Sequence, residues 1–218
     1  MSETAPLQKL LTFLSPAFPV GAFAWSAGLE TAIAEGAVTD STQLQNWLAG
    51  TLAHGAVRTD ATLLALAYAA DPDQLGPLAD LAIALTPSAE RSQEMLLTGD
   101  AFATAASAWP SSVYDRLPSP CPYPIAVGAI AAAHGIALEP ALIAFITAAV
   151  QSQVSVAVRL VPIGQTAGLS VIAALEPAVA NLAAAAATAT LDDLGGIAYA
   201  TDIAQMRHET LPTRIFRS

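Results

Sequence analysis

The sequence predicts an all-α protein, a single-domain bundle of roughly nine or ten helices. Three observations support this. Apolar residues recur at helical spacing along the whole chain, while the alternation typical of strands is nearly absent. Alanine supplies much of the 54% hydrophobic content, which favours close packing of helices. The length of 218 residues suits one large domain covering residues 1–218.

In the first half of the chain, the predicted helices are separated by proline, glycine and capping residues. Ser15-Pro16 ends the first helix, and Ser26 caps the second, which ends at Gly36. Asp40 or Ser41 begins the third helix, and Thr86-Pro87 has the order of a helix start. The predicted helical segments are 7–14, 26–36, 41–55, 61–70, 71–85 and 87–107.

A turn-rich connector, Trp109–Pro124, leads into the second half of the chain. Helices are expected to begin at Pro124 and Pro140, the second reaching about residue 159. Glu176-Pro177 is predicted to divide two further helices, and Gly195-Gly196 to precede the last one. These last three segments are 163–175, 177–189 and 198–208.

Composition excludes several classes of protein. The net charge of −10 argues against a sequence-independent nucleic-acid binder. Polar residues at 151–153 and 155 interrupt the 19-residue uncharged run Pro140–Val158, so it does not resemble a membrane-spanning helix. The N-terminus lacks the features of a secretory signal, and the single cysteine, Cys121, precludes an internal disulfide. A soluble cytoplasmic protein, with a buried and inert Cys121, is expected.

Residue patterns for catalysis or cofactor binding are missing. The only lysine, Lys9, has no glycine-rich phosphate loop around it, and no nucleophile elbow is present. His54, His134 and His208 are scattered without metal-ligand spacing, so each is interpreted as a surface or structural residue. We therefore expect no enzyme, no bound cofactor and no metal site. Glu90, Arg91 and Glu94 are interpreted as one solvated helix face.

Two terminal segments call for a different explanation. In residues 15–30, Phe18, Val20, Phe23 and Trp25 crowd into a loop, and must fold back onto the core or meet a partner. Three of the eight Lys and Arg residues lie in the last twelve positions. There, Ile215 and Phe216 stand between two arginines, a mixture suited to anchoring in a partner's groove. A loose, solvated end is the alternative.

In these same segments the chain resembles the UreF family of urease accessory proteins. The N-terminal match consists of Ser15, Pro16, Pro19, Val20, Gly21, Phe23, Ser26, Gly28, Leu29 and Glu30. Two further matches are residues 157–165 and, at the C-terminus, 202–204, 206–210 and 213–218. Ala22 departs from the family pattern by replacing a glycine, and Ala24-Trp25 by replacing Ser-Tyr.

The resemblance implies an all-helical, dimeric and non-catalytic protein. Such a protein joins the accessory protein UreD (also called UreH) and the GTPase UreG on the urease apoprotein, where a dinuclear nickel centre is assembled with GTP. It is also implied to modulate the GTPase, while nickel and GTP are handled by the partners. The tail is implied to dock against UreD, and residues 1–6 and 209–218 are predicted to be flexible until a partner docks.

The predicted site residues follow from both arguments. The predicted partner contacts are Trp25, Glu30, Arg207, Arg214, Phe216 and Arg217. Gly21 is a predicted turn residue with positive φ, and Gly28 is predicted to allow close helix approach. The alternative function is a helical enzyme or carrier that encloses an apolar small molecule. It requires an acid–base pair in a cavity, for example His54 with Asp60.

Overall fold

The computed structural model describes residues 4–218, and within this range the chain contains helices and no strand. This confirms the predicted all-α fold and the expected number of helices. The α-helices are α1 (Thr4–Phe13), α2 (Leu29–Ala34), α3 (Ser41–His54), α4 (Ala56–Ala69), α5 (Leu75–Ala84), α6 (Ala89–Ala106), α7 (Tyr123–Ala133), α8 (Leu138–Leu160), α9 (Gly164–Ala187) and α10 (Tyr199–His208). Short 3-10 helices cover η1 (Ala22–Ala24), η2 (Pro72–Gln74), η3 (Tyr114–Arg116) and η4 (Leu191–Asp193).

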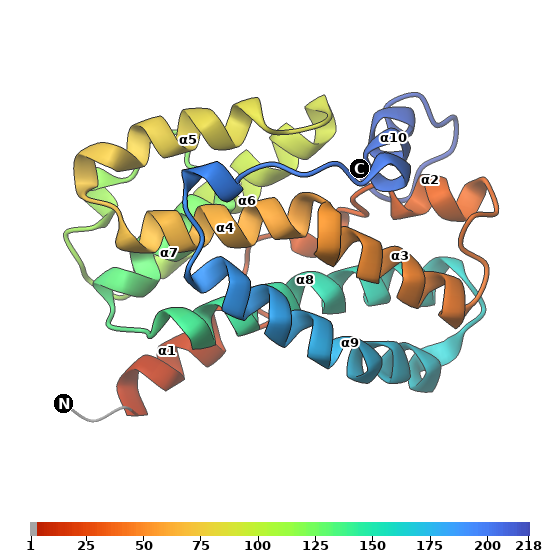
Figure 1. The fold of residues 1–218 in the computed structure, drawn as a ribbon, viewed down its shortest axis with the longest axis horizontal. Helices are drawn as coiled ribbons and strands as arrows, with labels where there is room; N and C mark the ends of the chain where they lie inside the picture. Colours follow the sequence, from red (N-terminus) through yellow and green to blue (C-terminus); the bar gives the residue numbers. More distant parts are fainter. Residues whose placement is uncertain (1–3) are drawn as a thin grey trace.

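The core lies between pairs of long helices. Helix α4 packs along α7, α7 along α6, and α8 along α9, while α3 crosses onto α9. Figure 1 shows α3 and α4 through the middle of the bundle, with α8 and α9 on one side and α5 and α6 on the other. Glycine permits one of these approaches, because a Cβ at Gly128 would lie 2.3 Å from the Leu64 carbonyl oxygen.

Several local predictions are confirmed. The Asp40 side chain caps α3 by accepting the Gln43 N–H at 2.8 Å, and Gly36 with φ of +78° follows α2. The start of α6 lies slightly later than predicted, because Ser88 provides the capping oxygen for the Arg91 N–H. Cys121 is buried, and burial raises the pKa of its thiol to about 12.

The predicted break at Glu176-Pro177 is wrong. Helix α9 continues from Gly164 to Ala187 with Pro177 inside it. Pro177 lies on the exposed face of the helix, where water can bond the backbone carbonyl that proline leaves free. On the opposite face, Leu175 and Val179 are both buried, so core packing holds the two halves in line.

Helices α8 and α9 are long and apolar enough to cross a membrane by length and composition, a test that core helices of soluble proteins also pass. Much of α8 is buried inside this fold, including Leu142, Phe145 and Ile146. Its polar residues Ser152 and Gln153 are half-buried and line a partly open cavity of about 130 Å³. The composition of α8 is therefore accounted for by its place in the core.

The fold brings the two segments singled out in the sequence together at one end of the bundle. Helix α10 packs on α2, and Figure 1 shows the C-terminus beside these two helices, far from α1. Of residues 1–6, predicted to be flexible, 1–3 lie outside the described residues and 4–6 begin α1.

Candidate partner-binding site at the docked C-terminal tail

The last ten residues, 209–218, are called the C-terminal tail, and residues 24–30 are called the cradle on which it lies. The backbone pairs the two segments directly. The Ser26 N–H donates to the Ser218 carbonyl oxygen at 2.6 Å, and the Ser26 hydroxyl donates to the same oxygen. The Arg217 N–H donates to the Ala24 carbonyl oxygen at 2.8 Å. The tail is thus packed on its own chain; that it becomes ordered only with a partner stays a prediction.

Glu30 is the main polar anchor of the tail. Its carboxylate accepts the N–H of Ile215 at 2.7 Å and the N–H of Phe216 at 3.0 Å. A third contact at 3.0 Å joins it to Nε2 of His208. A carboxylate is an acceptor-only group with several lone pairs, so it can bind two tail amides and the imidazole at once. Glu30 is positioned in the first turn of α2, where a negative charge is also favoured by the helix dipole.

The last four side chains of the tail alternate between the surface and the core. Phe216 is buried, and the guanidinium carbon of Arg159 lies 5.6 Å from the centre of its ring. Arg217 points outward, with its guanidinium carbon 5.1 Å from the ring centre of buried Trp25. Ile215 is 72% exposed. The tail therefore seals the cradle and presents an apolar side chain and arginines to the outside.

The structure brings five of the six predicted contact residues into this tail–cradle assembly. Arg214 pairs with Glu90 at 2.7 Å, at the edge of the assembly. Arg207 lies apart on the exposed side of α10, where it pairs with Glu35 at 3.1 Å. Trp25, Glu30 and Phe216 are buried, so their surfaces are already occupied by the chain itself. Their contact with another protein stays a prediction.

The cradle and the loop that leads into it contain unusual backbone conformations. Gly21 has φ of +74° and Gly28 has φ of +80°, both in the left-handed region. A Cβ at Gly28 would lie 2.7 Å from the backbone nitrogen of Gln205, so this glycine lets α2 approach α10 closely. Ala22 needs no positive φ, since Ala27 is the one non-glycine residue among those described that has it, at +49°.

The four apolar residues of the N-terminal loop differ in how deeply they are buried. Phe18 and Val20 pack against the core, with the Phe18 ring 5.7 Å from that of Phe13. Trp25 is buried under the tail, whereas Phe23 is 71% exposed on η1. Three of the four side chains therefore fold back onto the chain, and Phe23 remains on the surface beside the cradle.

Sequence reasoning missed the polar cluster beneath the tail. His208 is fully buried, and its Nδ1 lies 2.7 Å from a carboxylate oxygen of Glu90. The interpretation of Glu90, Arg91 and Glu94 as a solvated face is wrong. Glu90 contacts His208 and pairs with Arg214 of the tail. Arg91 is buried and pairs with Glu94. The sequence signal lay in the matched block that contains His208, but the contact bridges residues far apart in the chain.

A second buried ionic cluster joins α4 to α6. Arg91 pairs with Asp60 and, at 3.2 Å, with Glu94. Burial raises the pKa of both carboxyl groups, and the charge of Arg91 offsets this in part. The two negative charges in turn outweigh burial and raise the pKa of Arg91. The cluster links α4 to α6, and removal of one of its charges would leave an opposite charge buried without a partner.

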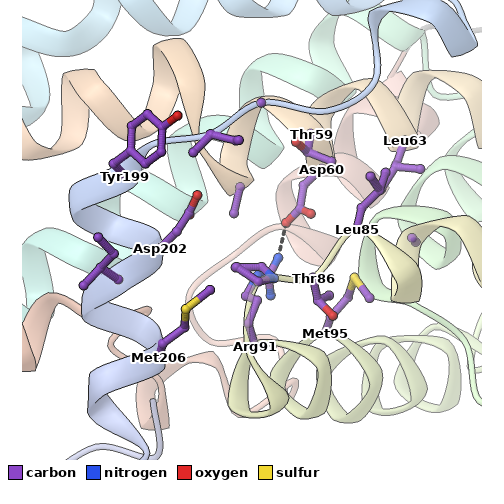
Figure 2. Close-up of a pocket in the computed structure, with 16 residues that line it drawn as sticks. Thr59, Asp60, Leu63, Leu85, Thr86, Arg91, Met95, Tyr199, Asp202 and Met206 are labelled. Carbon is purple, nitrogen blue, oxygen red and sulfur yellow. Dashed lines mark hydrogen bonds and ion pairs between the residues drawn. The ribbon is translucent and has the colours of Figure 1, made fainter.

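Asp60 and Arg91 of this cluster line a pocket of about 350 Å³. Figure 2 shows Tyr199, Asp202 and Met206 of α10 facing Asp60 and Arg91 across this space. Two of the lining residues, Tyr199 and Met206, are exposed to solvent. Burial raises the pKa of Asp202, although the Ala198 N–H bonds its carboxylate at 3.2 Å.

His54 and Asp60, the example of an acid–base pair given for the alternative function, do not face each other. His54 lies on the surface at the end of α3, whereas Asp60 is bonded to Arg91. Within residues 4–218, no group of three or more histidine, cysteine or acidic side chains is arranged to hold a metal ion. His134 has a structural position, with Nδ1 3.2 Å from Lys9 and Nε2 3.1 Å from the Tyr114 hydroxyl.

Comparison with known proteins identifies the family. A sequence model of the UreF family matches residues 38–176. A protein of Rhizobium leguminosarum bv. trifolii named urease accessory protein UreF is 49% identical over 218 residues, covering 99% of this chain and 98% of the relative. Proteins of the same name from Agrobacterium fabrum and Rhodopseudomonas palustris (strain BisB5) are 48% and 46% identical, covering 100% and 99% of this chain and 98% and 93% of the relatives. This chain therefore belongs to the UreF family of urease accessory proteins.

Proposed function

We propose that this chain is a non-catalytic scaffold that joins UreD (UreH) and the GTPase UreG on the urease apoprotein. In this role it acts as a cytoplasmic homodimer, modulates the GTPase and supports GTP-dependent assembly of the nickel centre. Nickel and GTP are handled by its partners, so the scaffold has no cofactor of its own. The general role in urease maturation comes with the family, and the division of labour among partners is the proposal.

The observation that carries this proposal is the surface built jointly by the tail and cradle. Arg217 and Ile215 project from a segment whose alternate residues are buried, so they are held on a fixed base. Phe23 adds a second exposed apolar side chain from the neighbouring η1. Arginine and aromatic side chains are enriched among the residues that dominate protein–protein interfaces. A fixed, mixed basic and apolar surface on an acidic chain suits recognition of another polypeptide.

The test is a reconstitution of the complex from purified components. Arg217→Ala removes the exposed guanidinium and a cation–π contact worth about 0.5–1 kcal/mol, so the fold is expected to survive. The double variant Arg217→Ala with Ile215→Ala removes both projecting side chains. We expect these variants to lose co-elution with UreD and UreG in size-exclusion chromatography, and to fail in urease activation.

The matched control is Arg116→Ala, which removes an exposed arginine from η3, outside the tail–cradle assembly. It should bind and activate like the unmodified chain. Circular dichroism and thermal unfolding of each variant check that folding is intact. If the double variant folds, co-elutes normally and activates urease at the unmodified rate, the tail–cradle surface is not the recognition element.

A further inference from the structure

We propose that His208 is a positioning residue that carries a proton on both ring nitrogens when the tail is docked. Docking is then coupled to uptake of one proton, and the tail is released as pH rises. The inference deepens the proposed function by naming a regulation of the same surface. Its consequence for partner binding rests on that proposed function, whereas the proton coupling is a property of the isolated chain.

The geometry around the imidazole carries the argument. His208 is 0% exposed, and each ring nitrogen faces a different carboxylate oxygen. Nε2 lies 3.0 Å from Glu30 of α2, and Nδ1 lies 2.7 Å from Glu90 of α6. A neutral imidazole has one N–H and one lone pair. One of the two contacts would then set a nitrogen lone pair against a carboxylate oxygen with no proton between them, at a distance too short for a water molecule to lie between the two atoms.

The other partners of the two carboxylates favour the ionised form of these groups. Glu30 accepts two tail N–H groups, from Ile215 and Phe216. Glu90 accepts from the guanidinium of Arg214 at 2.7 Å through its second oxygen. Both carboxylates are thus arranged as acceptors, which assigns the two protons to the imidazole. With His208 charged, the two glutamates are balanced by one imidazolium and one guanidinium.

Other charged groups near this cluster are already engaged elsewhere. On α10 itself, Arg207 pairs with Glu35 on the surface. Glu209 accepts the N–H of Ala89 at the start of α6 with its carboxylate. From the elements packed on His208, the facing groups are therefore Glu30 of α2 and Glu90 of α6, with Arg214 of the tail behind Glu90.

The direction of the pH dependence of docking follows from this proton. The docked state holds a proton that a solvent-exposed histidine gives up in the range of about pH 5–8. Because docking takes up this proton, docking is strongest at the acidic end of the range and weakens as pH rises. A single coupled proton changes the docking equilibrium by up to about tenfold per pH unit. Once the proton is lost, the buried glutamates would face a neutral ring and the tail would lose its anchor.

The experiment measures tail docking on the full-length chain alone, by NMR and amide hydrogen exchange between about pH 6 and 9. The readouts are the protection factors of the Ile215 and Phe216 amides and the nitrogen shifts of the His208 ring. We expect both ring nitrogens to be protonated at the acidic end of this range. The protection factors of the two amides should fall by up to about tenfold per pH unit as pH rises through the deprotonation of the ring. Amides of α4 provide a reference for global opening.

Variants separate proton coupling from a purely structural role. In Glu90→Gln, an amide can face the ring nitrogen without a proton on it, so the tail should stay docked with a flat pH profile. His208→Gln should lower protection and also flatten the profile, while the matched exposed-histidine control His54→Gln should follow the unmodified chain. A flat profile in the unmodified chain, a singly protonated ring at the acidic end, or an unchanged slope in Glu90→Gln would overturn the proposal. These results do not depend on partners, so failure of the complex reconstitution remains a separate outcome.

Discussion

Gly28 offers a direct test of how tightly the cradle is held. The substitution Gly28→Ala adds one Cβ at a residue with φ of +80°, where an L-residue is strained by about 1–2 kcal/mol. The added atom would also lie 2.7 Å from the backbone nitrogen and 2.9 Å from Cγ of Gln205. The first of these contacts is to backbone, so α10 as a whole must shift away from α2. Overpacking of this kind costs about 1–3 kcal/mol.

Gly36→Ala is the matched control. Gly36 has nearly the same φ, +78°, but a Cβ there meets nothing within 4 Å. It therefore isolates the backbone strain, with an expected loss of about 1 kcal/mol after the smaller entropy of the unfolded alanine chain is included. For Gly28→Ala we expect a loss of about 2–4 kcal/mol, the sum of the same net backbone strain of about 1 kcal/mol and about 1–3 kcal/mol of overpacking.

Urea unfolding followed by circular dichroism gives both free energies of unfolding, and thermal unfolding should shift by about 2–4 °C per kcal/mol in a chain of this length. Gly28→Ala should also weaken the tail, because α10 carries His208 against Glu30. Equal losses for the two variants would refute the close approach of α2 to α10 and, with it, the packing argument for the cradle.

Three further outcomes are expected. Arg91→Met leaves two buried carboxylates without their cation, so the free energy of unfolding should fall by about 3–5 kcal/mol near pH 7. Burial already raises the pKa of both carboxyl groups in the folded chain. The variant should therefore regain stability below about pH 4, where these groups are protonated even in the unfolded chain, and lose it as pH rises through their raised pKa in the folded chain. The deficit in the free energy of unfolding, measured with urea, should shrink on acidification, and a pH-independent deficit would contradict this. The thiol of Cys121 is buried and its pKa is raised to about 12, so in the native chain it should resist a thiol reagent near pH 8. It should react once the chain is unfolded in urea, and rapid labelling of the native chain would show that the thiol is accessible. Burial and the charge of Lys9 lower the pKa of His134, so its ring should titrate below about 6.5 by NMR, and Lys9→Met should raise that midpoint; no change would place Lys9 away from the ring.

The local sequence predicted most helices because their ends depend on nearby residues. The Asp40 cap and the glycine at position 36 act within one turn of the helices that they bound. The break predicted at Pro177 is wrong for the complementary reason. Whether a proline ends a helix depends on its surroundings, and here Leu175 and Val179 are buried in the core on either side of Pro177, within one continuous helix α9. No local pattern reports that packing.

Part of the candidate site likewise followed from the sequence, and part depended on tertiary packing. The helical spacing of apolar residues along the whole chain by itself determined an all-helical fold, and the scarce arginines and loop aromatics marked two unusual ends. Only the tertiary structure decided that Phe216 and Trp25 are buried by their own chain, and that Glu30, Glu90 and His208 meet. The physical reason is distance along the chain: α2 and α6 reach His208 from 178 and 118 residues away, and only the packing of α10 on both helices brings these three charges together.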